Sequence, residues 1–241
     1  MPVMKMTKEY VLDIGHIDGR GLARPSAIVE FMQDLATCHA AEIGVSGEAV
    51  AEKHAFWVLS RLKYQLDRPL LPYETIQLTT MPREIRGASW YRDFTIADAS
   101  GEIGHAVTAW AVVNLETRRL IRPNELGIQL EKQETGQTEL LRAIRSRQLE
   151  PCFDRVVRYS DIDINRHLNN VKAVDILSDA FDLEHEENRW VSQLQVNYIT
   201  ENVCGTTLNL RRGPGKEGSL CVSAFHGDKE TVQAEVVFST R

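Results

Sequence analysis

The chain has 241 residues, of which 43% are apolar and 26% charged, an ordinary composition for a globular protein. A chain of this length buries roughly 70–75% of its unfolded surface, so its core needs no disulfide or metal. The formal net charge of −6 argues against DNA or RNA as the main partner.

Three further features of the sequence narrow its setting. The apolar runs are shorter than the ~20 residues that a membrane-spanning helix requires. The N-terminus lacks the apolar segment of a signal peptide. The four cysteines are scattered without a Cys-x-x-Cys pair. We therefore expect a cytoplasmic protein without a membrane span, in which the thiols stay reduced.

The first half of the chain predicts one helix followed by strands. A short strand at 10–14 leads through a glycine-rich turn into a helix that begins at Pro25 and Ser26. Apolar residues in this helix recur at the spacing of one buried face: Ile28, Phe31, Met32 and Leu35. Strands are expected at 57–66, 75–80, 90–96 and 103–115, and the segment 98–101 indicates a hairpin turn between the last two.

The second half predicts the same order of elements. A strand at 153–159 precedes a helix that begins near Leu168. The buried side of this helix is Val171, Val174, Leu177 and Phe181. Four strands follow, at 190–199, 206–211, 219–225 and 231–238, with turns at 213–215 and 226–228 between the later ones.

The two halves therefore align as a repeat. Leu22 matches Leu168 at an offset of 146 residues, and Trp57 matches Trp190 at an offset of 133. At the first offset the polar residues Asp163, Asn165 and His167 correspond to 17, 19 and 21, which are Ile, Gly and Gly. Only the second copy is expected to carry chemistry.

The repeat sets the expected domains and fold class. We predict an N-terminal domain over 1–122, a linker over 123–152 with a short helix around Leu140, Leu141 and Ile144, and a C-terminal domain over 153–241. Each copy would be an α+β unit whose antiparallel sheet wraps around its own helix. Pairing of the two sheets edge to edge would make the chain a monomeric pseudo-dimer or half of a homodimer.

The densest polar cluster lies where strand meets helix in the second half. Asp161, Asp163 and Asn165 resemble the start of an EF-hand calcium loop. That loop needs Gly and Glu where this chain has Arg166 and Lys172. We expect no metal and no other cofactor.

Further along the cluster, Asn169 or Asn170 could cap the helix. The alternating Asp163, Asn165 and His167 can point to one side of an extended segment. An acid, an amide and an imidazole placed together favour acid–base chemistry.

The motif Asp163-x-Asn165-x-His167-x-Asn-Asn-Val-Lys resembles the signature of the plant and bacterial acyl-acyl carrier protein thioesterases, which are built as a double hot dog. Segments 57–62 and 110–120 resemble the same family. The resemblance implies hydrolysis of fatty acyl-acyl carrier protein to free fatty acid by Asp163, Asn165, His167 and a glutamate on the following strand, which falls on Glu201. The family often has a Cys directly after this Glu; Cys204 stands further on, and we expect it to be an apolar-strand cysteine.

Thioester chemistry explains why such a set would suffice. The leaving thiol has a pKa near ~8.5, so the difficult step is the addition of water to the carbonyl. We expect Glu201 and Asp163 to polarise the water, His167 to act as base or orienter, and Asn165 to fix substrate or water. The start of the helix would stabilise the oxyanion. Which acid does which task stays open.

The first half would then shape a pocket for the acyl chain. Its candidate lining residues are Phe31, Met32, Trp57 and Trp90, for which plain core packing is the alternative. The acidic carrier protein would need a cationic docking surface. Three groups are candidates: Arg83, Arg86 and Arg92; Arg118, Arg119 and Arg122; Arg142, Arg145 and Arg147.

Three other functions remain open from the sequence. Hydrolysis of acyl-CoA needs the same chemistry with a nucleotide-binding rim. An acyl-binding hot dog module without catalysis would not need the acid–amide–imidazole set. A dehydratase of the same fold class takes its histidine and acid from a different arrangement.

Overall fold

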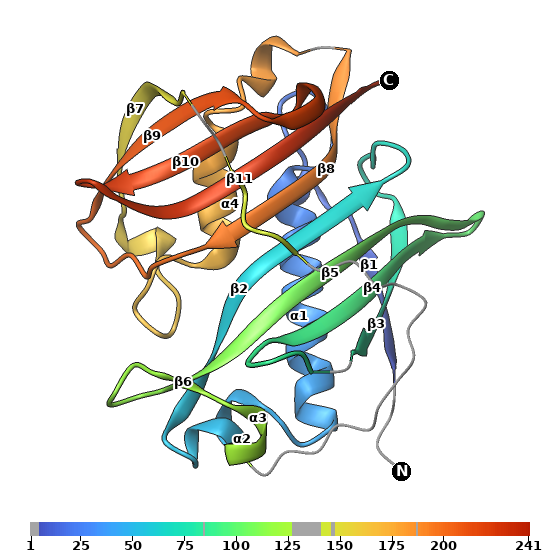
Figure 1. Ribbon diagram of the computed structural model, residues 1–241. Coiled ribbons are helices and arrows are strands. Elements are labelled where there is room, and N and C mark those ends of the chain that lie inside the picture. Colours follow the sequence, from blue (N-terminus) through green and yellow to red (C-terminus); the bar gives the residue numbers. More distant parts are fainter. Residues whose placement is uncertain (1–4, 84, 127–140, 146–147, 187) are drawn as a thin grey trace. The chain divides into compact units, whose positions relative to one another are not determined.

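The computed structural model describes residues 5–83, 85–126, 141–145, 148–186 and 188–241 (Figure 1). The chain packs into two compact units. Unit 1 comprises Met1–Val11, Phe31–Leu62 and Thr75–Leu141, and unit 2 comprises Leu12–Glu30, Lys63–Glu74 and Arg142–Arg241. Among the described residues, no helix has the length and apolar character needed to cross a bilayer.

Unit 1 holds an antiparallel sheet in the order β1-β3-β4-β5-β2. The strands are β1 (Met6–Val11), β2 (Ala55–Leu66), of which this unit contains the part up to Leu62, β3 (Thr75–Pro82), β4 (Trp90–Asp98) and β5 (Gly101–Asn114). The short β6 (Leu120–Ile121) pairs with β5. The helices are α1 (Pro25–Glu42), of which this unit contains the part from Phe31 onward, α2 (Gly47–Ala51) and α3 (Pro123–Leu126). The predicted hairpin turn is confirmed, since Asp98 pairs with Gly101.

The C-terminal part of α1 packs against β1 in this unit. The rings of Tyr10 and Phe31 stack with their centroids 4.5 Å apart. The Tyr10 hydroxyl and the Lys8 ammonium both donate to Asp34, at 2.7 and 2.6 Å. The apolar face predicted for this helix is confirmed, because Ile28, Phe31, Met32 and Leu35 are all at most 5% exposed.

Unit 2 holds a second antiparallel sheet in the order β8-β11-β10-β9-β7. Its strands are β7 (Glu150–Val156), β8 (Arg189–Tyr198), β9 (Thr207–Pro214), β10 (Leu220–His226) and β11 (Lys229–Thr240). Helix α4 (Asn170–Ser178) packs on β10 and β11 (Figure 1). Val174 and Leu177, predicted for its buried side, are at most 1% exposed. Short 3-10 helices are η1 (Ile14–His16), η2 (Tyr159–Asp161), η3 (Leu183–His185) and η4 (Lys216–Gly218).

Three predicted elements differ in the structure. The strand expected at 10–14 is β1, which ends at Val11 because Asp13 accepts a hydrogen bond from the Gly15 N–H and starts η1. The helix expected near Leu168 begins at Asn170, after a cap described below. The helix expected in the linker is absent over the described residues 141–145, where Leu141 and Ile144 are buried in non-helical chain; Leu140 lies outside the described residues.

Candidate active site

The loop between η2 and α4 carries three of the four candidate residues and is closed by its own backbone. The Asp163 N–H donates to the His167 carbonyl at 2.9 Å, and the Arg166 N–H donates to the Asp163 carbonyl at 3.0 Å. The Asp163 carboxylate accepts the N–H groups of Asn165 and His167 at 2.8 and 3.3 Å. Asp163 therefore braces the loop, while Asn165 is exposed near its tip.

The segment after β8 brings Glu201 to His167. The His167 Nε2 atom lies 3.3 Å from Glu201 Oε2. Backbone contacts fix this approach, because His167 forms a β-bridge with Val203 and the Leu168 N–H donates to the Asn202 carbonyl at 2.7 Å. The two side chains are 21% and 40% exposed, so the pair is reachable from solvent. An imidazole beside a carboxylate at this distance can hold and transfer a proton.

The start of α4 is occupied by a side-chain cap. Asn169 accepts hydrogen bonds from the N–H groups of Val171 and Lys172, at 2.8 and 3.3 Å. The Tyr198 hydroxyl donates to the Asn170 carbonyl at 3.0 Å, and burial raises the pKa of this phenol, which keeps it protonated. The capping prediction is confirmed for Asn169. The N–H groups of Val171 and Lys172 are already bonded to this cap, so they are not free for the oxyanion site expected at the start of the helix.

A loop with the same backbone precedes α1. We call residues 13–23 the first-copy loop and residues 158–168 the second-copy loop. The bridge Ile17–Ala23 in one corresponds to Ile162–Leu168 in the other. In the first-copy loop the Asp18 carboxylate accepts the N–H groups of Arg20 and Leu22 at 2.9 and 3.1 Å, as Asp163 does for Asn165 and His167.

These hydrogen bonds correct the repeat alignment by one residue. The structural offset is 145, so Asp163, Asn165 and His167 correspond to Asp18, Arg20 and Leu22. Ala23 N–H donates to the Leu70 carbonyl as Leu168 N–H donates to that of Asn202, which places Pro69 opposite Glu201. The first copy therefore retains the aspartate and has leucine and proline in place of His167 and Glu201. The match of Asp18 to Asp163 was the signal in the sequence that could have shown this offset.

Leu22 and Pro69 line a small cavity of about 20 Å³ in unit 2. That volume is enough for about one water molecule. A more open hollow of about 360 Å³ is lined by the same two residues together with Leu71 and Trp190, among others. At the positions of His167 and Glu201, the first copy thus has two apolar residues, although charged side chains such as Arg20 and Arg68 also line these hollows.

The four residues predicted to line an acyl pocket lie in unit 1. Phe31, Met32 and Trp90 are at most 5% exposed, and Trp57 is partly buried. The rings of Trp57 and Trp90 meet edge to face at 5.2 Å, and the Trp57 indole donates to the Val45 carbonyl at 2.9 Å. All four therefore pack in the core of this unit, and their contact with an acyl chain stays a prediction.

Two of the three arginines in the first cationic group suggested for docking, Arg83 and Arg92, are not surface groups, whereas Arg86 is exposed. Arg83 and Arg92 are 8% and 7% exposed. Arg83 pairs with Asp93, and Arg92 donates to His39 Nδ1 at 2.7 Å and to the Thr80 hydroxyl at 3.3 Å. Burial lowers the pKa of Arg92 to about 10. The docking prediction is wrong for Arg83 and Arg92, because both side chains are buried, Arg83 just after β3 and Arg92 within β4.

The other two cationic groups suggested for docking lie on the surface wherever the structure describes them. Arg118, Arg119 and Arg122 are exposed, and so are Arg142 and Arg145. Arg147 lies outside the described residues.

Cys204 is exposed in a turn of unit 2, so the expectation of an apolar-strand cysteine is wrong.

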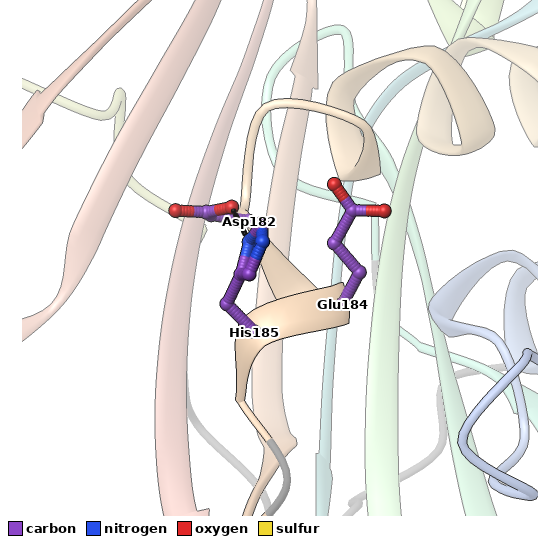
Figure 2. A group of neighbouring side chains, drawn as sticks. All are labelled: Asp182, Glu184 and His185. Carbon is purple, nitrogen blue, oxygen red and sulfur yellow. Dashed lines mark hydrogen bonds and ion pairs between the residues drawn. The ribbon is translucent and has the colours of Figure 1, made fainter.

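A cluster of titratable side chains lies on an exposed turn of unit 2. The polar atoms of Asp182, Glu184 and His185 lie within 4.8 Å of one another there (Figure 2). An ion pair of 2.6 Å between His185 Nδ1 and Asp182 raises the pKa of the imidazole and accounts for the position of both side chains.

Comparison with known proteins begins with the fold. A crystal structure of an acyl-ACP (acyl carrier protein) thioesterase from Bacteroides thetaiotaomicron matches with a TM-score of 0.87 and 24% identity, over 98% of each chain. The 12:0-ACP thioesterase from Umbellularia californica matches with a TM-score of 0.82 and 17% identity, over 100% of this chain and 99% of that one. The fold is the double hot dog, as the sequence predicted.

The family follows from two sequence models. Residues 4–126 match the acyl-ACP thioesterase N-terminal domain, and residues 151–238 match the acyl-ACP thioesterase C-terminal domain. The chain belongs to the acyl-ACP thioesterase family.

Curated relatives carry corresponding names. The palmitoyl-acyl carrier protein thioesterase of Gossypium hirsutum is 26% identical over 74% of this chain and 47% of its own length. An acyl-[acyl-carrier-protein] hydrolase of Cuphea viscosissima is 26% identical over 87% of this chain and 53% of its own. The chain thus spans about half the length of these relatives, both of which are named as chloroplastic.

Proposed function

We propose that this chain hydrolyses the thioester of fatty acyl-acyl carrier protein and releases the free fatty acid. The observation that carries the proposal is the contact of 3.3 Å between His167 Nε2 and Glu201 Oε2, in a chain of the acyl-ACP thioesterase family. The names of the relatives support the same substrate class.

In the proposed reaction, the oxygen of a water molecule adds to the thioester carbonyl carbon. The proton of that water passes to the pair formed by His167 and Glu201, and the carboxylate stabilises the imidazolium. The carbon–sulfur bond then breaks, and the thiolate leaves and takes up the proton from the pair. Because a thiol has a pKa near ~8.5, its departure needs little help from a strong acid.

Asp163 serves in this scheme as a positioning residue. Its carboxylate accepts the His167 N–H and so holds the backbone that carries the imidazole. Asp18 makes the equivalent hydrogen bonds in a loop without a histidine, which supports a role for this aspartate in the loop itself. Asn165 is exposed near the pair and would orient substrate or water from the loop tip.

The remaining parts of the proposal concern the pocket and the setting. The interior of unit 1, including Phe31, Met32, Trp57 and Trp90, would receive the acyl chain. The predicted domains, 1–122 and 153–241 with the linker between them, would then divide binding from chemistry. The four cysteines are free, which supports a reducing compartment such as the cytoplasm. A place in fatty acid synthesis follows from the proposed acyl carrier protein substrate.

Release of free thiol from a series of acyl carrier protein thioesters of increasing chain length tests the proposal. We expect turnover for at least one chain length, with a higher kcat/KM than for the same acyl group on CoA. Hydrolysis of no thioester at any chain length would contradict the proposal. A higher kcat/KM on CoA would instead indicate an acyl-CoA thioesterase.

A further inference from the structure

The second-copy loop differs from the first-copy loop at three positions whose side chains are exposed in the second copy. At the structural offset, Arg158 stands opposite Asp13, Ile164 opposite Gly19, and Arg166 opposite Gly21. The two loops share the backbone hydrogen bonds described above. The fold of the loop therefore needs none of these three larger or cationic side chains.

Ile164 is a large apolar residue whose side chain lies in solvent. Its side chain is 97% exposed, so it contributes almost no burial to the fold. It lies three residues before His167 in the loop that carries the imidazole. Val203, which bridges to His167, is also exposed, at 53%. An apolar surface thus adjoins the candidate catalytic pair.

Arg166 adopts a backbone conformation that favours glycine. Its φ is 64°, in the left-handed region, and its counterpart Gly21 has a φ of 77°. A side chain in this region costs roughly 1–2 kcal/mol, a cost that glycine avoids. Because the first copy forms the same loop with glycine at this position, the loop does not need the arginine side chain to fold.

The charges at these positions favour an acidic partner. Arg158 and Arg166 are both exposed, whereas the first copy has an aspartate and a glycine. The two carboxylates of the second-copy loop are already hydrogen-bonded within the chain. Asp161 accepts from the Arg155 side chain and the Arg158 N–H, and Asp163 accepts from backbone N–H groups of the loop. The outward charge of the loop is therefore cationic, although the whole chain carries −6.

We propose that Arg158, Ile164 and Arg166, which we call the docking tip, bind the acidic acyl carrier protein beside the His167–Glu201 pair. The inference rests on the proposed function. A carrier that delivers a thioester to this pair must dock on the surface around it. The docking tip supplies an apolar contact and two cations there, which suits an acidic protein surface.

The first copy supplies the variants for a test. Arg158→Asp, Ile164→Gly and Arg166→Gly, combined in one protein, give the docking tip the residues of the first-copy loop. The loop is expected to fold, since the first copy folds with these residues. The same acyl group is offered on acyl carrier protein and on a small pantetheine thioester, which bypasses docking.

We expect kcat/KM on the carrier substrate to fall at least ~10-fold more than kcat/KM on the small thioester. Added salt should also reduce the carrier reaction of the wild type more steeply than that of the variant. A matched control, Lys5→Asp with Val11→Ser, changes an exposed cation and an exposed apolar residue of unit 1 that belong to none of the candidate docking groups. It should leave the ratio of the two substrates at its wild-type value.

Several outcomes would overturn the docking proposal. Equal losses on both substrates would place the tip in folding or chemistry, and no loss on either would remove it from recognition. A loss in the control as large as in the tip variant would assign docking to unit 1. Binding of acidic phospholipid vesicles that the tip variant abolishes would assign the tip to a membrane surface. A wild type that hydrolyses neither thioester would instead refute the proposed function, and this inference with it.

Discussion

The first-copy and second-copy loops share their backbone hydrogen bonds, but only the second-copy loop carries side chains suited to acid–base chemistry. Each is closed by a β-bridge and braced by an aspartate that accepts two backbone N–H groups. One places Leu22 where the other places His167, and Pro69 stands opposite Glu201. The comparison shows which groups the loop needs in order to fold and which serve the candidate site. The aspartate, present in both copies, supports the loop. The imidazole and the glutamate, present only in the second copy, form the candidate site.

The largest effect is expected when the second-copy loop receives the residue of the first. His167→Leu should lower kcat by ~10²-fold or more, since an acid–base group is removed. The protein should still fold, because the same backbone accommodates Leu22. Thiol release measures the rate, and circular dichroism checks the fold. A variant that keeps the wild-type rate would refute the role of His167.

The two aspartates should both support their loops but differ in activity. Asp163→Ala and Asp18→Ala each remove hydrogen bonds to two backbone N–H groups, which should cost about 0.5–2 kcal/mol of unfolding free energy, as the loss of a helix cap does. Asp18→Ala should cost more than Asp163→Ala, because it also breaks the ion pair of Asp18 with Arg20. Only Asp163→Ala should also reduce kcat, because only its loop carries the imidazole. Urea unfolding and thiol release measure the two effects. Equal losses of activity in both variants would contradict the assignment.

Substitutions at Gly21 and Arg166, which both have a left-handed backbone, should change the free energy of unfolding in opposite directions and by a smaller amount. Gly21→Ala should lower the free energy of unfolding by about 1 kcal/mol, whereas Arg166→Gly should raise it or leave it unchanged. Thermal unfolding of both variants under one set of conditions measures the difference. A stabilising Gly21→Ala would show that the backbone of the first-copy loop is not fixed as described.

The smallest expected effect lies outside both loops, at the exposed pair of Asp182 and His185. Pairing raises the pKa of His185, so its contribution to stability is present below the unfolded-state value near ~6.5 and is lost as the pH rises through the raised pKa. Asp182→Asn should therefore destabilise the protein slightly at mildly acidic pH and less at alkaline pH. Unfolding at the two pH values measures this, and a larger effect at alkaline pH would contradict the sign.

The sequence predicted the fold well where periodicity was strong. The apolar spacing of α1 identified Ile28, Phe31, Met32 and Leu35, which are buried in the structure. The motif around His167 was visible because its polar residues are contiguous. Glu201 came only from the family resemblance, since nothing local marks a glutamate after a strand as the partner of a histidine.

Other features depended on information that the sequence does not display. In the sequence, the match of Leu22 with Leu168 favoured an offset of 146 between the two copies, whereas the match of Asp18 with Asp163 gives 145. Only the backbone hydrogen bonds show that 145 is right. Arg92 belonged to a cationic cluster in sequence, but strand alternation in β4 turns it toward His39. The sequence offered both Asn169 and Asn170 as caps of the helix, and only the structure shows that Asn169 binds the N–H groups of Val171 and Lys172.

A double-mutant cycle tests the central assignment most directly. His167→Leu, Glu201→Gln and the double variant are compared with the wild type by thiol release from one acyl carrier protein thioester. If the two side chains activate water as a unit, each single variant should lose ~10²-fold or more in kcat, and the double variant should lose little beyond the worse single one. Wild-type turnover in either single variant, or losses that multiply in the double variant, would contradict the account.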